Sequence, residues 1–188
     1  MKPRQRPSNQ LRLIGGQWRS RRLEFPDLPG LRPTPDRVRE TLFNWLAPRL
    51  PGARCLDLFA GSGALGLEAL SRGAAETLFV EQHPQAVGAL RENLARLNAQ
   101  GGRVERADAL DWLRQPATPF EIVFLDPPFA DGLLEPACAL LEQGGWLTAN
   151  AWIYLEAPAN QAAPLLPAAW SLHREKVAGT VAYRLARR

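Results

Sequence analysis

From residue 53 to residue 156, short apolar runs alternate with longer stretches in which apolar residues recur at helical spacing. The apolar runs predict strands at residues 54–59, 76–81, 103–107, 120–125 and 151–156. The stretches between them predict helices at residues 64–72, 84–98, 109–114 and 133–143, with His83 or its neighbour and Asp108 as N-caps. This alternation indicates a parallel sheet with helices on both faces.

The two ends of the chain have different patterns. Residues 11–25 contain two short β-like runs about Gly15-Gly16 and predict a small hairpin that carries several arginines. Near the C-terminus, residues 170–176 and 181–185 alternate in polarity and predict an antiparallel hairpin. We therefore expect a mostly parallel sheet with a hairpin added at each end of the chain.

A further helix is predicted after a proline-rich loop at residues 26–33. Thr34 is expected to act as its N-cap and Pro35 as its first residue, with Asp36 near the positive end of the helix dipole. Apolar residues at helical spacing continue to Leu46, and prolines then end the helix.

Length and composition fit one globular domain. Apolar residues make up 46% of the 188 residues and charged residues 22%, so disorder, collagen and coiled coil are excluded as descriptions of the whole chain. No apolar run approaches the roughly 20 residues of a membrane span, and no apolar segment follows the basic N-terminus as in a secretory signal. Cys55 and Cys138 lie far apart and indicate reduced thiols in the cytoplasm.

Positive charge is concentrated in the first fifth of the chain. The 23 basic residues comprise 21 arginines and 2 lysines, and residues 1–40 carry a net charge of +6 against −2 for residues 41–188. A GC-rich genome would explain the excess of arginine over lysine, but it would not explain the clustering. The asymmetry indicates a nucleic acid or a membrane surface as a partner.

A glycine-rich segment follows the first predicted strand of the sheet. Gly61-Ser62-Gly63-Ala64-Leu65-Gly66 has the spacing of a dinucleotide-binding turn. Glu81 ends the next strand, where a carboxylate can accept hydrogen bonds from both hydroxyls of a ribose. These features suit a nicotinamide dinucleotide or S-adenosylmethionine equally, and the alternative is a plain tight turn.

Two further carboxylates favour S-adenosylmethionine. Asp57 lies inside the first strand of the sheet, where its charge would attract the cationic amino-acid end of this cofactor and repel a pyrophosphate. Asp108 ends the third strand and is placed to accept a hydrogen bond from an adenine amino group.

Asp126-Pro127-Pro128-Phe129 follows the fourth predicted strand, at the edge where open α/β sheets bind ligands. The prolines have no backbone N–H, so this turn offers carbonyl acceptors, to which Asp126 adds its carboxylate. Such acceptors would hold an exocyclic amino group with its lone pair toward a methyl donor, and Phe129 would stack on a flipped base. The alternative is a proline-rich loop without a catalytic role.

The combination of Asp57 and the glycine segment with Asp126-Pro127-Pro128-Phe129 resembles class I methyltransferases that act on amino nitrogens. More narrowly, segments 15–19, 31–46 and 172–179 resemble the bacterial RsmD family of 16S ribosomal RNA guanine-N2 methyltransferases. The resemblance begins at about residue 11, reaches the end of the chain and departs from the family at no motif position. It implies a seven-stranded Rossmann-like sheet that uses S-adenosylmethionine and no metal.

The resemblance also implies roles for individual residues. The target would be the N2 amino group of one guanine, of the guanine-966 type, in the small subunit. The candidate catalytic residues are Asp126, Pro127, Pro128 and Phe129. The candidate cofactor-binding residues are Asp57, Phe59, Ala60, Gly61, Ser62, Gly63, Glu81, Asp108 and Ala109.

The arginine-rich start then has a physical role, because arginine binds phosphate in a bidentate manner. The candidate RNA-binding residues are Arg12, Arg19, Arg21, Arg22 and Arg32. The chain would comprise a basic disordered arm at residues 1–10, an RNA-contacting hairpin and loop at residues 11–33, and a methyltransferase domain at residues 34–188. We expect a cytoplasmic monomer that binds 16S ribosomal RNA or the 30S subunit and no membrane.

Three other functions stay open at this point. A DNA adenine-N6 methyltransferase uses a similar Asp-Pro-Pro-aromatic motif, but it usually carries a large target-recognition domain for which this chain has no room. The glycine spacing would also fit an NAD-dependent oxidoreductase. Asp57 and the lack of a catalytic acid–base set argue against that function. A non-enzymatic RNA-binding module would not need Asp126 beside a cofactor site.

Overall fold

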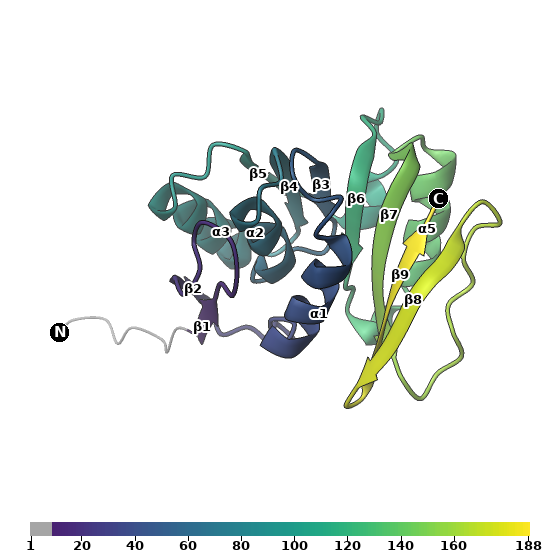
Figure 1. Ribbon diagram of the computed structural model, residues 1–188, viewed down its shortest axis with the longest axis horizontal. Helices are drawn as coiled ribbons and strands as arrows, with labels where there is room; N and C mark the ends of the chain where they lie inside the picture. The colour runs from purple at the N-terminus through teal and green to yellow at the C-terminus, as the bar shows by residue number, and fades with distance from the viewer. Residues whose placement is uncertain (1–8) are drawn as a thin grey trace.

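The computed structural model describes residues 9–188, so most of the basic arm expected at residues 1–10 lies outside the described residues (Figure 1). Within residues 9–188, seven strands form one sheet in the order β5-β4-β3-β6-β7-β9-β8. Neighbours from β5 to β7 are parallel, whereas β9 is antiparallel to both β7 and β8. The strands are β3 (Arg54–Asp57), β4 (Glu76–Glu81), β5 (Gly102–Arg106), β6 (Phe120–Leu125), β7 (Leu147–Pro158), β8 (Ser171–Ala178) and β9 (Val181–Arg187).

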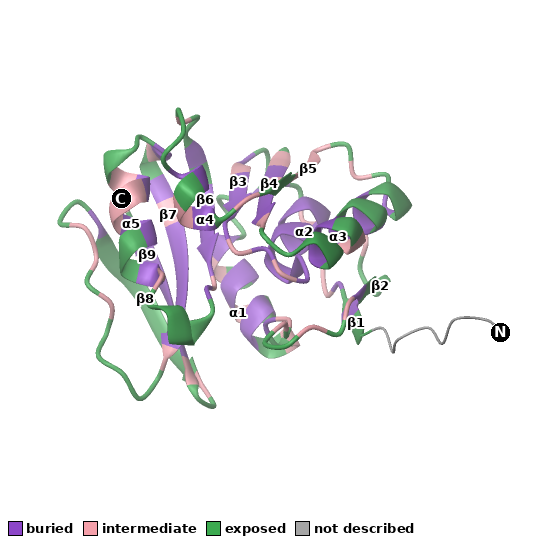
Figure 2. Cartoon of the chain, turned by 180° about the vertical axis from the view of Figure 1, so that it is seen from behind, coloured by how far each residue is buried: buried purple, intermediate pink, exposed green. Residues whose placement is uncertain are grey.

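Helices cover both faces of this sheet. On one face lie α1 (Asp36–Leu46), α2 (Ala64–Ser71) and α3 (Pro84–Arg96), and on the other lie α4 (Ala109–Trp112) and α5 (Leu134–Gln143) (Figures 1 and 2). None of the helices within residues 9–188 combines the length and the apolar character that crossing a membrane requires. The predicted mostly parallel α/β sheet with a C-terminal antiparallel hairpin is confirmed.

The central strands are buried on both sides, and their side chains alternate between two apolar layers. Phe124 of β6 and Tyr154 of β7 belong to the layer under α1. Val123 and Ile153 belong to the layer under α4 and α5. The same alternation determines toward which face of the sheet a polar side chain at the end of a strand points.

The N-terminal hairpin consists of β1 (Asn9–Arg12) and β2 (Arg22–Phe25), which pair only with each other within the described residues. Its apolar side chains join one core cluster with residues of α2 and α3. Pairing begins at Asn9, so the last two residues of the expected arm belong to the hairpin. The connection runs over residues 13–21 and is longer than a turn at Gly15-Gly16, because the Gly15 N–H is bound by a side chain of α2.

Two of the three predicted helix caps are present. His83 Nδ1 accepts a hydrogen bond from the N–H of Gln85, and Asp108 Oδ1 accepts one from the N–H of Asp111, so both N-caps are confirmed. The prediction for α1 is wrong, since this helix begins at Asp36 without a side-chain cap. Thr34 is buried with its hydroxyl facing the end of β6 instead of the helix amides.

Candidate active site

A cleft of about 590 Å³ opens at the carboxyl ends of the parallel strands. At its centre β3 and β6 are neighbours, and the chain continues from them in opposite directions along the sheet, to β4 and to β7. Open α/β sheets bind ligands at such a switch point. The cleft is lined by the loop at residues 28–35, by the turns after β3, β4 and β6, and by Glu156 of β7.

The structure brings nearly all the predicted catalytic and cofactor-binding residues to this one cleft. The candidate catalytic residues line it, as do all candidate cofactor residues except Gly63. Gly63 has φ of +78°, and a Cβ atom there would lie 2.4 Å from Cδ2 of Leu90. Gly63 therefore permits close packing at the start of α2 and does not line the cleft.

Glu81 is held at the cleft by two backbone amides. The Gly61 N–H donates to Oε2 at 2.8 Å and the His83 N–H donates to Oε1 at 2.7 Å. Gly61 has φ of +53°, a conformation that glycine adopts without strain. The glycine turn and the end of β4 thus fix a half-buried carboxylate at the position predicted to meet ribose hydroxyls.

Asp57 is a buried carboxyl group at the floor of the cleft. Its Oδ2 accepts a hydrogen bond from the N–H of Gly66 at 2.9 Å. Burial raises the pKa of Asp57 to about 7, the Gly66 hydrogen bond opposes this change, and the charge of Glu81 adds to it. A cation beside Asp57 would relieve the cost of its buried charge.

Asp108 and Ala109 form another part of the wall. The Asp108 carboxylate accepts from the N–H of Asp111 at 3.0 Å and caps α4. This residue therefore has a structural role in addition to the adenine contact that the sequence predicts for it.

Asp126 lies beside a second carboxyl group, that of Glu156. Leu125 of β6 pairs in register with Leu155 of β7, so the next residue of each strand is adjacent to the other. Glu156 Oε1 accepts a hydrogen bond from the Tyr154 hydroxyl at 2.8 Å. The cleft thus contains a pair of neighbouring carboxyl groups, one of which the sequence motifs do not indicate.

The surroundings of this pair favour its protonated form. Burial raises the pKa of Asp126 well above its usual value, and the charges of Glu156 and Asp57 raise it further. Burial also raises the pKa of Glu156, although the hydrogen bond from Tyr154 opposes this change. Two carboxyl groups so close together favour a state in which they share a proton.

After Asp126 the chain turns through two prolines into a 3-10 turn, Phe129–Asp131. Pro127 is buried, whereas Phe129 keeps 40% of its surface exposed. An aromatic side chain with that much exposed surface at the cleft is available for stacking.

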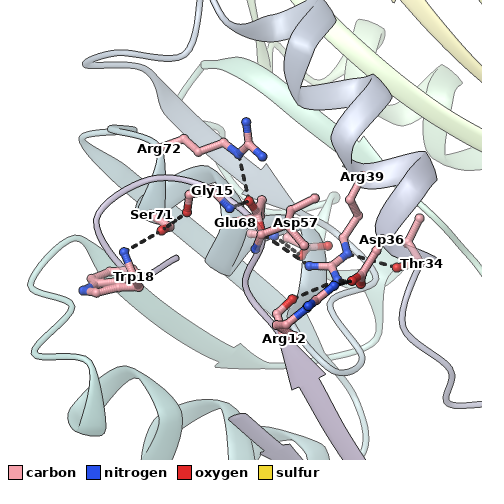
Figure 3. A network of polar contacts seen from close by, with 12 residues as sticks. Arg12, Gly15, Trp18, Thr34, Asp36, Arg39, Asp57, Glu68, Ser71 and Arg72 are labelled. Carbon is pink, nitrogen blue, oxygen red and sulfur yellow. Dashed lines mark hydrogen bonds and ion pairs between the residues drawn. The ribbon is translucent and has the colours of Figure 1, made fainter. Parts of the chain in front are cut away.

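A buried ion pair attaches the N-terminal segment to the sheet domain (Figure 3). Arg39 of α1 donates to Glu68 of α2 at 3.3 Å, and both side chains are buried. Arg39 also donates to the backbone carbonyls of Arg12 at 2.9 Å and Thr34 at 3.0 Å. Glu68 accepts from the Gly15 N–H at 2.7 Å. The network holds both the hairpin connection and the residue that faces Asp126.

The five arginines predicted to bind RNA are exposed, and four of them lie on the hairpin, where Arg12 of β1 pairs in register with Arg22 of β2. Arg32 lines the cleft. Arg19, Arg21 and Arg22 lie on β2 and on the connection that precedes it. Arg12 is paired with Asp36 at 2.7 Å, so its charge is partly compensated within the chain.

The sequence interpretation assigns no individual role to Thr34, Glu156, Arg39 or Glu68, although the resemblance implies that the segment from Arg32 to Glu40 borders the pocket, and residues 32–35 line the cleft. Glu156 ends the strand predicted at residues 151–156, so its place at the same sheet edge as Asp126 was a usable signal. No local pattern distinguishes Arg39 or Glu68, because charged residues on helices are usually exposed.

Comparison with known proteins gives matches over almost the whole chain. Residues 11–187 match the family model described as conserved hypothetical protein 95. Ribosomal RNA small subunit methyltransferase D of Escherichia coli strain K12 is 58% identical over 187 residues, which cover 100% of this chain and 94% of that protein. The protein of the same name from Haemophilus influenzae is 45% identical over 192 residues, with 98% of each chain covered.

A solved structure agrees with these sequence matches. The Escherichia coli protein yhhF superposes with a TM-score of 0.91 at 56% identity, over 96% of this chain and 98% of that one. The resemblance inferred from segments 15–19, 31–46 and 172–179 is thereby confirmed. The chain belongs to the RsmD family, whose model is described as conserved hypothetical protein 95, and it is a methyltransferase.

Proposed function

We propose that the protein transfers a methyl group from S-adenosylmethionine to the exocyclic N2 of one guanine in 16S ribosomal RNA. The observation that carries this proposal is the position of Asp126-Pro127-Pro128-Phe129 in the same cleft as Asp57 and Glu81. A methyl donor and an amino acceptor thus have adjoining sites. The names of the relatives, ribosomal RNA small subunit methyltransferase D, support this class of substrate.

The residues around β3 and β4 fit S-adenosylmethionine, which when bound would supply an electrophilic methyl group on a positively charged sulfur. Asp57 forms no ion pair within residues 9–188, so an ammonium group would stabilise its charge. Glu81 would accept from the ribose hydroxyls and Asp108 from the adenine amino group. A pyrophosphate beside Asp57 would be repelled, which argues against a nicotinamide dinucleotide.

The turn after β6 would hold the target amino group. Asp126 and the carbonyl oxygens at Pro127 and Pro128 are acceptors, and the prolines add no competing N–H. Hydrogen bonds from both N2 hydrogens to these acceptors would leave the nitrogen lone pair facing the methyl group. Phe129 would stack on the base and keep it in this orientation.

The same carboxyl group would handle the proton. As the carbon–nitrogen bond forms and the carbon–sulfur bond breaks, N2 becomes positively charged and must lose one proton. The pKa of Asp126 is raised by burial and by Glu156, so Asp126 accepts a proton more readily than an exposed carboxylate does. Its negative charge would also stabilise the charge that develops on N2.

The exposed arginines would bring RNA to the cleft. The loop at residues 28–33 lines both the cleft and a second groove, which is bordered by Asn9, Gln10 and Phe25 of the hairpin. Arg32 belongs to both, so a strand bound along the groove would reach the cleft at this residue.

In this proposal the hairpin and loop contact RNA and the remainder of the described chain is the catalytic domain. The substrate would be 16S ribosomal RNA or the 30S subunit, and the protein would act as a monomer in the cytoplasm. Residues 11–33 would correspond to the first part and residues 34–188 to the second.

The test is methylation of small subunits purified from a strain that lacks this gene. With radiolabelled S-adenosylmethionine we expect one N2-methylguanine in 16S ribosomal RNA, located by mass spectrometry. Asp126→Ala should lower the rate by about 100-fold or more, while Asp131→Ala, which changes an exposed residue of the adjacent turn, should not. No methylated guanine, or full activity without Asp126, would contradict the proposal. Methylated adenine in DNA, or thermal stabilisation by NAD alone, would support the competing functions.

A further inference from the structure

Glu156 is a buried residue of the cleft that belongs to none of the sequence motifs and has no direct role in the proposed methyl transfer. It is 4% exposed and lines the cleft beside Asp126. Phe124 and Tyr154, two residues earlier in β6 and β7, pack under α1. Because side chains alternate along a strand, Asp126 and Glu156 point toward that same face.

No cation compensates this carboxyl pair within residues 9–188. Neither Asp126 nor Glu156 forms an ion pair with an arginine or lysine there. The donors supplied by the protein side chains are hydroxyl groups: that of Tyr154 on Glu156 at 2.8 Å and that of Thr34 on Asp126 at 3.4 Å. Both carboxyl groups are largely shielded from water and have few hydrogen-bond donors, so their charged forms are unfavourable before a ligand binds. The site is therefore complementary to a ligand that brings N–H groups.

We propose that Glu156 makes the cleft specific for guanine by accepting the N1–H of the base, while Asp126 receives the neighbouring N2 amino group. This inference rests on the proposed function. Guanine presents N1–H and the N2 amino group as adjacent donors on its Watson–Crick edge, which is the edge that enzymes read on a flipped base. Adenine presents a lone pair at N1 beside its amino group, and the Glu156 carboxylate would face that lone pair.

Rejection of the wrong base follows from the burial of Glu156. An acceptor that faces another acceptor inside a cleft lacks both water and a donor, and this costs more than the loss of one hydrogen bond. Guanine also supplies donors to both carboxyl groups and so stabilises their charged forms. Binding of the correct base would therefore replace the proton that the pair otherwise shares.

The test uses 2-aminopurine, which keeps the amino group at position 2 but has a lone pair at N1. Small subunits are reconstituted with 16S ribosomal RNA that carries guanine or 2-aminopurine at the methylated position. We expect the wild-type enzyme to prefer guanine by about 100-fold in kcat/KM. Glu156→Gln should reduce this preference to less than about 10-fold, because the amide N–H of glutamine can donate to the unprotonated N1.

The matched control is Glu105→Gln, which makes the same chemical change at an exposed position of β5 and should keep the wild-type preference. The base analogue also lacks O6, but this is common to all enzymes tested, so the change in preference reports on N1. A Glu156→Gln variant with an unchanged preference would overturn the inference, whether its kcat/KM is the same as that of the wild type or is lowered equally on both substrates.

Folding of Glu156→Gln is checked by its affinity for S-adenosylmethionine, which should equal that of the wild type. If this variant does not fold, Glu156→Asp supplies the test, because it keeps the carboxylate and should keep the preference for guanine. Loss of that preference in Glu156→Asp, with cofactor binding intact, would overturn the inference. A wild-type enzyme that methylates no guanine would refute the proposed function itself, which is a different outcome.

Discussion

The guanidinium of Arg39 and the carboxylate of Glu68 meet at 3.3 Å in the interior, although they come from α1 and α2 and only 1% and 0% of their side chains are exposed. Through backbone hydrogen bonds, this pair binds the connection of the hairpin and the residue before Pro35 (Figure 3). This buried ion pair therefore helps to anchor the N-terminal segment in the catalytic domain, together with the apolar packing of the hairpin against α2 and α3.

Replacing Arg39 by methionine should destabilise the protein by about 3–5 kcal/mol, because it leaves Glu68 with a buried and less compensated charge. Urea denaturation measures the free energy of unfolding. Arg37→Met is the control, since Arg37 is exposed on the same helix, and it should change the stability by less than about 0.5 kcal/mol. Equal stabilities of the two variants would show that the pair does not anchor the segment.

Two glycines should respond to alanine with opposite signs. Gly63 has φ of +78°, and a Cβ there would lie 2.4 Å from the Leu90 side chain, so Gly63→Ala should cost about 1–3 kcal/mol. Gly88 lies within α3, and no atom lies within 4 Å of the place that a Cβ would take, so Gly88→Ala should stabilise by about 0.4–1 kcal/mol. Thermal unfolding of both variants checks the signs, and destabilisation by Gly88→Ala would contradict this interpretation of α3.

The strands of the sheet were predictable because their signal is local. Residues 76–81 and 120–125 are strands with the predicted bounds, since β-branched and aromatic residues there form short apolar runs between turns. The strand predicted at residues 151–156 is longer in the structure, Leu147–Pro158, because its pairing with β9 extends to Pro158. The site residues at the ends of these strands were predictable for the same reason.

The features that escaped prediction depend on contacts between distant parts of the chain. Thr34 has the local pattern of a helix cap, but its hydroxyl lies next to Asp126, 92 residues away. Gly15 has the pattern of a turn, but its N–H is bound by Glu68, 53 residues away. Periodicity and capping rules describe neighbours in sequence. They therefore predict a local role even for a residue whose hydrogen-bond partner lies far away in the sequence.

The pKa of Asp57 gives a pH dependence for cofactor binding. Its value is about 7 in the folded protein against an ordinary value of 3.8, so between these values the folded state holds a proton that the unfolded state has lost. The stability that this group contributes to the unliganded protein therefore falls as the pH rises toward 7. A cationic ligand prefers the ionised form, so the affinity for S-adenosylmethionine should rise between about pH 6 and pH 7.5 by this linkage.

Isothermal calorimetry at several pH values checks this expectation. Asp57→Asn should bind the cofactor more weakly at about pH 7.5 and should show little of the pH dependence, because its amide does not titrate. An affinity that falls over this pH range in the wild type would show that Asp57 does not face the ammonium group.

Tyr154 should set the acidic limit of activity. Its hydroxyl donates to Glu156 and lowers the pKa of that carboxyl, so Tyr154→Phe should raise the pKa of Glu156 further. If guanine requires the ionised carboxyl groups, the acidic limb of kcat/KM should then move to higher pH. Two other carboxyl groups are part of this electrostatic environment: Asp126 acts on Glu156 directly, and the charge of Asp57 acts on Asp126.

The pH profile of subunit methylation measures this shift. Tyr183→Phe is the control, because Tyr183 is a buried tyrosine of β9 in the same apolar layer and should leave the acidic limb in place. A limb that stays unchanged in Tyr154→Phe would show that the ionisation of Glu156 does not limit binding of the base.

The proposed RNA contacts of the hairpin are best tested by charge and not by truncation. Deleting residues 1–22 would remove Leu11 and Leu13, which are buried against α2 and α3, and would expose that core. Changing Arg19, Arg21 and Arg22 to glutamine leaves the core intact. We expect weaker binding of small subunits, a salt dependence whose slope, log K against log salt, is smaller by about 2–3, and unchanged affinity for S-adenosylmethionine.

The control changes three exposed arginines outside the hairpin, Arg91 of α3 and Arg103 and Arg106 of β5, to glutamine. This variant loses the same net charge, so long-range attraction falls equally in both. Only the hairpin variant should lose the direct phosphate contacts and hence the larger part of the salt dependence. Equal losses in the two variants would mean that the arginines of the hairpin act through net charge alone and do not form an RNA interface.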